Sequence, residues 1–115
     1  MLEAIIMTML FSVRVNEIRA AHEMPPIQFS IQEHTKEYAL ECDPVRKKGT
    51  WFIMSSGTSS CGKNTAESRA DMIYALDEQY ADNRSPFFNT DTQYLSIMVN
   101  DCPNDKIFIT AEDAE

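Results

Sequence analysis

The stretch LSIMVNDCPNDKIFIT, residues 95–110, decides the fold of this chain. Apolar residues recur at every second position from Leu95 to Val99, which predicts a strand over 93–101. A shorter run of the same kind predicts a return strand over 106–110. We therefore expect an antiparallel hairpin with a four-residue connection, CPND.

Apolar residues at helical spacing predict two helices in the first third of the chain. The first covers 2–23, is expected to be well buried, and ends before a Pro-Pro pair. The second opens with a capping box formed by Ser30 and Glu33 and ends at Pro44. Its expected inner face consists of Ile31, Thr35, Tyr38, Ala39 and Cys42.

The middle of the chain predicts one strand and one helix. The apolar run WFIM at 51–54 is typical of a buried strand. Asn64 and Glu67 repeat the capping pattern and predict a third helix. Its inward side is expected to hold Ala66, Ala70, Ile73, Leu76 and Tyr80. This order of elements predicts an α+β fold, a three-layer α-β-α sandwich around a small, mostly antiparallel sheet.

Length, charge and cysteine content limit the kinds of protein this chain can be and the partners it can bind. A chain of 115 residues fits one domain, here 1–115. Its formal charge of −8 has the wrong sign for nucleic acid or an anionic membrane. The apolar run 4–13 is too short for a transmembrane span, and Glu3 stands where a signal peptide carries positive charge. Three cysteines can close at most one disulfide, and their spacing fits no zinc motif.

Four segments occur in the order found in one known family. They are 16–27, which includes an Asn, an Arg and a His before Pro-Pro; 30–42, which ends in Cys; 62–66, GKNTA; and the hairpin 95–110. Together they resemble the CAP family of cysteine-rich secretory, antigen 5 and pathogenesis-related class 1 proteins. The resemblance implies a CAP-type sandwich and an extracellular protein. It also implies structural roles for Asn16, Arg19 and His22, the last as a packed, hydrogen-bonded residue.

The family's cleft can hold a divalent metal with two histidines and two acids, and this chain departs from that set. Met54 and Asn83 stand at the two histidine positions, and Lys63 replaces one acid. Glu78 alone matches the other acid, and no histidine follows His34. We therefore expect neither a metal nor a cofactor.

The family's disulfides are also reduced. The resemblance pairs Cys102 with a cysteine at the position of Ala111, so Cys102 lacks its family partner. Whether Cys42 meets Cys61 or Cys102 stays open, because it depends on distances that sequence does not give. The chain is also shorter than the family between the third helix and the hairpin.

These observations favour a non-catalytic, secreted binding module rather than an enzyme. Its partner would be a protein or an apolar small ligand such as a lipid or sterol. Two alternatives stay open: a hydrolase in the same cleft, either cysteine-dependent through Cys61 or metal-dependent, and an intracellular acidic inhibitor or adaptor. Asp77 is expected to be an ordinary surface charge. The candidate contact residues are Met54, Cys61, Lys63, Asn64, Glu78, Asn83, Phe87 and Phe88.

Overall fold

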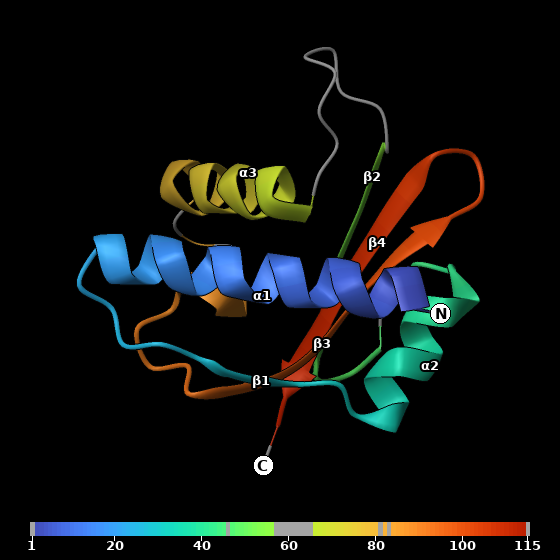
Figure 1. Cartoon of the computed structure of the whole chain (residues 1–115), viewed down its shortest axis with the longest axis horizontal. Helices are drawn as coiled ribbons and strands as arrows, with labels where there is room; N and C mark the ends of the chain where they lie inside the picture. Colours follow the sequence, from blue (N-terminus) through green and yellow to red (C-terminus); the bar gives the residue numbers. More distant parts are fainter. Residues whose placement is uncertain (1, 46, 57–65, 81, 83, 115) are drawn as a thin grey trace.

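The hairpin lies inside a four-stranded mixed sheet whose strand order is β1-β3-β4-β2 (Figure 1). The computed structural model describes residues 2–45, 47–56, 66–80, 82 and 84–114. Within them the strands are β1 (Gln28–Ser30), β2 (Thr50–Ser56), β3 (Tyr94–Cys102) and β4 (Lys106–Asp113). The helices are α1 (Leu2–Ala21), α2 (Glu33–Glu41) and α3 (Ala66–Gln79), with a short 3₁₀ turn η2 (Pro86–Phe88). The predicted α+β class is confirmed.

The predicted hairpin is present, with a tighter turn. β3 and β4 pair antiparallel, and Cys102 lies opposite Lys106, so three residues connect the strands rather than four. Asn104 and Asp105 both adopt left-handed backbone angles, with φ of 65° and 56°. Asn and Asp tolerate this conformation because their short side chains bond locally. The turn closes one residue earlier for that reason.

Strand β1 was not predicted. It pairs parallel with β3 over three residues, from Gln28 opposite Tyr94 to Ser30 opposite Ser96. Three residues are too few to show an alternating pattern. Ser30 therefore lies in a strand, and the predicted capping box is wrong: Gln32 is the N-cap of α2 and makes no side-chain cap bond.

Helix α1 buries one stripe instead of its whole surface. The buried residues recur every three or four positions, which leaves apolar side chains on the opposite side exposed, among them Leu2, Met9 and Val13. The prediction of a well-buried helix is wrong because α1 packs on the rest of the molecule through one side only. α1 ends at Ala21, two residues early, since Glu23 turns into the left-handed region at φ 60°. Its buried residues are Ala4, Thr8, Phe11, Val15, Ile18 and Arg19.

Side chains of β4 alternate between two hydrophobic clusters. Ile107 and Ile109 belong to a large cluster with residues of α1 and α3, which run side by side across the strands (Figure 1). Phe108 belongs to a smaller cluster with Tyr38 of α2 and Cys102. No helix within the described residues is long and apolar enough to cross a membrane.

Candidate functional site

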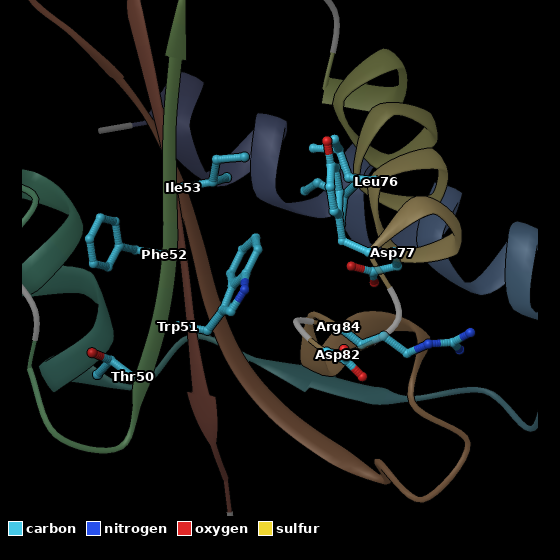
Figure 2. A pocket seen from close by; sticks show the side chains of 10 residues that line it. Thr50, Trp51, Phe52, Ile53, Leu76, Asp77, Asp82 and Arg84 are labelled. Carbon is cyan, nitrogen blue, oxygen red and sulfur yellow. The ribbon is translucent and has the colours of Figure 1, made fainter.

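A groove of about 490 Å³ opens between β2 and α3 (Figure 2). Trp51 and Ile53 point from β2 toward α3, whereas Phe52 points toward α2, because successive side chains of a strand face opposite ways. Leu76 projects from α3 toward the groove. The walls therefore combine apolar side chains with polar groups, and they come from two elements that residues 57–65 separate in sequence. Among the described strands, β2 is an edge strand that pairs only with β4.

Asp77 fixes the end of the groove. Its side chain is buried, and its two carboxylate oxygens accept hydrogen bonds from the Ser85 backbone N–H (2.9 Å) and the Ser85 hydroxyl (2.6 Å). This pair holds the segment after α3 against the helix. It places the exposed Asp82 and Arg84 at the groove, so charged groups lie at one end of it. Arg84 extends away from β2 (Figure 2).

The prediction of Asp77 as a surface charge is therefore wrong, and so is part of the predicted inner face of α3. Leu76 and Tyr80 are exposed, while Asp77 is 5% exposed. The carboxylate is stable there because both oxygens have hydrogen-bond donors. In the sequence, the only sign of this bond is that Ser85 follows Asp77 by eight residues in a predicted loop. Such a pair is too common in sequences to indicate a buried aspartate.

A second hollow of about 350 Å³ continues the groove beyond the start of β2. It shares Thr50, Trp51 and Arg84 with the first, and it reaches Glu112 of β4. The two hollows form one furrow with Trp51 at their junction.

Arg19 anchors the loop that follows the groove. Its guanidinium is fully buried and donates to four backbone carbonyls: Pro25 (2.7 Å), Phe87 (2.8 Å), Asn89 (2.9 Å) and Thr92 (3.4 Å). Burial lowers the pKa of Arg19 from its usual range. The side chain thus ties α1 to η2 and the residues after it.

Two other residues assigned structural roles lie on α1 or just beyond it. Asn16 forms a two-bond bridge to Ile27, donating to its carbonyl at 3.0 Å and accepting from its N–H at 2.9 Å. His22 was expected to be packed, but it is exposed and only one face of its ring is covered. Its ring stacks on Tyr74 with centroids 4.8 Å apart, and its Nδ1 lies 3.4 Å from the Tyr74 hydroxyl.

Several predicted contact residues lie elsewhere. Phe87 and Phe88 are core side chains with 0% and 1% exposure, so they offer no surface to a partner and that prediction is wrong. Their ring contacts explain it: Phe87 packs edge-on against Phe11 and Trp51. A pair of aromatic residues in a predicted loop looked exposed because sequence does not show what covers it.

The remaining predicted contact residues divide into two groups. Met54 is partly buried and packs with the α2 cluster, away from the groove, which corrects its assignment to the cleft. Glu78 is exposed on α3, and its interaction with the Tyr74 hydroxyl adds to burial in raising the pKa of that tyrosine. Four others fall outside the described residues: Cys61, Lys63, Asn64 and Asn83.

A disulfide joins Cys42 at the end of α2 to Cys102 at the end of β3, with an S–S distance of 1.99 Å and Cα atoms 5.8 Å apart. This resolves the pairing that sequence left open. Cys102 thus gains a partner other than the one at position 111 that the resemblance implied. Within the described part of the chain, no group of three or more His, Cys, Asp or Glu side chains could hold a metal ion.

A chain of polar contacts secures α2 to the sheet on the same side. The Ser96 hydroxyl accepts from the Gln32 N–H at 2.8 Å and donates to the Thr35 hydroxyl at 2.7 Å. Thr35 in turn donates to Glu112, which also lies 2.9 Å from Nδ1 of the exposed His34. These contacts tether the start of α2 to β3 and β4.

Comparisons with known proteins show a similarity of fold. No protein-family profile matches the chain, and no curated protein matches it in sequence. The crystal structure of hookworm platelet inhibitor is similar, with a TM-score of 0.61 over 92% of this chain and 67% of the inhibitor chain. The two are 13% identical in sequence, so the likeness concerns the fold.

Proposed function

We propose that this chain is a non-catalytic, secreted binding module with a CAP-type three-layer sandwich, and that the furrow between β2 and α3 holds an extended segment of a protein partner. One observation carries this proposal: a groove that combines apolar side chains with charged residues runs beside an edge strand. The four sequence segments that resemble the family and the fold shared with hookworm platelet inhibitor support it.

The shape and chemistry of the furrow favour an extended peptide. A sheet edge supplies backbone hydrogen bonds to an added strand, and neighbouring pockets take alternate side chains. Trp51 and Leu76 provide apolar contacts, while Asp82 and Arg84 can pair with polar or charged groups on the peptide. A partner with both kinds of group fits this lining better than a hydrocarbon tail does.

An apolar small ligand, such as a lipid or sterol, is the second candidate. The groove's volume of about 490 Å³ lies within the usual range for small-molecule sites. The apolar side chains of Trp51, Ile53 and Leu76 would contact a ring system or acyl chain. The groove's charged end would have to face the ligand's polar group.

The disulfide supports the extracellular part of the proposal, since such bonds persist mainly in oxidising compartments. Protein purified without reductant should contain one free thiol among its three cysteines. Titration of three free thiols would contradict secretion.

Trp51 allows a direct test, because it is the only tryptophan in the chain and it lies in the furrow. A phage-displayed library of random peptides is selected on the immobilised protein, and the peptides are then titrated against it in solution. We expect bound peptides to shift Trp51 emission and to lose about tenfold or more of their affinity for a Leu76→Lys variant. Leu40→Lys, at an exposed leucine on α2, is the matched control and should bind as the wild type does.

Two outcomes would decide against a peptide groove. Selected peptides that leave Trp51 emission unchanged and tolerate Leu76→Lys would place binding elsewhere on the surface. Cholesterol or palmitate that shifts Trp51 emission and displaces the peptides would favour the small-ligand candidate.

A further inference from the structure

The N-terminal half of α1 carries an apolar seam on its outer side, formed by Leu2, Ile6, Met9 and Val13. These side chains are 70%, 47%, 62% and 58% exposed. Leu10, which is 46% exposed, borders the seam. Single exposed apolar residues are ordinary, but a contiguous row on one helix is typical of an interaction surface.

The spacing of the seam indicates what kind of surface would cover it. Its residues follow one another at intervals of four, three and four, which is the heptad repeat of a helix that packs along another helix. Ile6 and Val13 take the a positions, and Leu2 and Met9 take the d positions.

The seam is also symmetric along its length. Leu2 and Val13 lie equally far from a midpoint between Met7 and Thr8, and so do Ile6 and Met9. In an antiparallel pair, Leu2 would face Val13 of a second copy and Ile6 would face Met9. A two-fold contact requires one patch to complement itself in this way.

Charge supports a second copy over other occupants. No charged residue occurs over 4–13, so the seam offers nothing to a charged macromolecule or to anionic headgroups. At its end, Arg14 is already engaged by Asp71 at 2.8 Å and by Glu17 at 3.4 Å. Two copies of a chain of net charge −8 repel each other over most of their surface, and here they would meet through a strip whose one charge is Glu3, beside Leu2 at its end.

A hollow beside the seam adds room for the second helix. It measures about 300 Å³ and lies between Met9 and Val13 on one side and Phe29 and Ile31 on the other. Apolar side chains of a second copy could fill it. Antiparallel packing would also keep the two Glu17 side chains at opposite ends, whereas parallel packing would bring them together.

We infer that the chain forms a two-fold dimer through antiparallel packing of the α1 seams of two copies. This inference is independent of the proposed peptide groove, since the seam lies on α1 and the groove between β2 and α3. The short seam makes a small interface, so we expect weak, reversible association.

Analytical ultracentrifugation of the full chain, over a concentration range that extends to millimolar, tests the dimer. Wild type should pass from monomer to dimer. Met9→Lys and Ile6→Lys should each weaken association by about tenfold or more, because each would bury an unpaired charge. Leu40→Lys and Val45→Lys, at apolar residues equally exposed elsewhere, should leave association unchanged. Circular dichroism checks that every variant stays folded, which its exposed position predicts.

Cross-linking tests the orientation in a Cys61→Ser background, which removes the third thiol. A mixture of Ile6→Cys and Met9→Cys chains should form mixed disulfide dimers faster than either variant alone. Ile6→Cys dimers that form faster than mixed dimers would overturn the antiparallel arrangement. A wild type that stays monomeric at millimolar concentration would overturn the dimer. So would a monomer that binds phosphatidylcholine vesicles through Met9, because a membrane surface would then be the occupant.

Discussion

The two faces of the sheet are held in different ways. On the α2 face, Phe108 is fully buried with Tyr38, a disulfide ties the helix to β3, and hydroxyl groups tether its start. On the α3 face, a larger cluster fills the centre, but Trp51 and Ile53 stay partly exposed beside the groove. The α2 face is therefore closed by a disulfide and hydrogen bonds, whereas the α3 face leaves the groove beside β2 open.

This difference separates stability from binding. Changes at Phe108 or at the disulfide should lower the free energy of unfolding and leave the residues that line the furrow unaltered. Changes at the groove should alter binding and leave the free energy of unfolding nearly unchanged, because a half-exposed side chain buries little apolar surface. The predictions below test that separation.

The largest effect is expected for Phe108→Ala. Its ring is fully buried, so truncation should lower the free energy of unfolding by about 3–5 kcal/mol. Ile53→Ala, at a partly exposed residue of the neighbouring strand, should lower it by about 1 kcal/mol. Urea titration followed by circular dichroism measures both. Equal losses would show that the two faces are packed alike.

Replacing both bridged cysteines, Cys42→Ser with Cys102→Ser, should lower the free energy of unfolding by about 2–5 kcal/mol. The bridge spans 60 residues in sequence and restricts the unfolded chain accordingly. Thermal unfolding with and without dithiothreitol provides the check. Reductant should destabilise wild type by a similar amount and leave the double variant unchanged.

Thr35→Val should lower the free energy of unfolding by about 1–3 kcal/mol, because it leaves the buried Ser96 hydroxyl and Glu112 without their shared partner. His34→Ala removes only the exposed end of the same tether and should change it by less than about 1 kcal/mol. Chemical denaturation of the two variants side by side measures the contrast. A larger loss for His34→Ala would mean that the His34–Glu112 contact, and not the hydroxyl chain, holds α2.

Alkaline pH should weaken the α2 face first. Burial, with smaller contributions from Asp43 and Glu41, raises the pKa of Tyr38 above its usual value of about 10. The folded state therefore favours the neutral phenol, which donates to the Val45 carbonyl at 2.5 Å. Its contribution is fully present below pH about 10 and is lost as pH rises through the higher folded pKa. Stability measured from pH 8 to 11 should fall less steeply in Tyr38→Phe than in wild type.

The smallest effect on stability is expected for Leu76→Ser. This exposed side chain lines the groove, so the free energy of unfolding should change by less than about 0.5 kcal/mol. Binding of peptides selected on wild type should nevertheless weaken, which fluorescence titration of Trp51 detects. A marked loss of stability would mean that Leu76 closes the core instead of a binding groove.

The sequence predicted elements whose signal is local. The hairpin followed from alternation around Val99, and the three helices from apolar spacing, because these patterns depend on near neighbours. β1 did not, since a parallel strand of three residues is defined by its partner β3, more than sixty residues away. The exposed seam of α1 was missed for a similar reason: apolar spacing does not tell which side of a helix a domain covers.

The candidate site was harder to predict than the fold. The resemblance directed attention to Phe87 and Phe88, which the structure places in the core, and away from Trp51, which lies at the groove. Burial of Asp77 depends on a loop that folds back to supply Ser85. Residues that meet across space through such loops leave no periodic trace in sequence.

The Cys42–Cys102 bridge closes a covalent ring that contains β2, α3 and the polypeptide between them. A protease that cuts once inside this ring would leave both fragments joined by sulfur, so the furrow's two walls could stay in place after nicking. A single cut on the groove side would therefore not release two separate pieces.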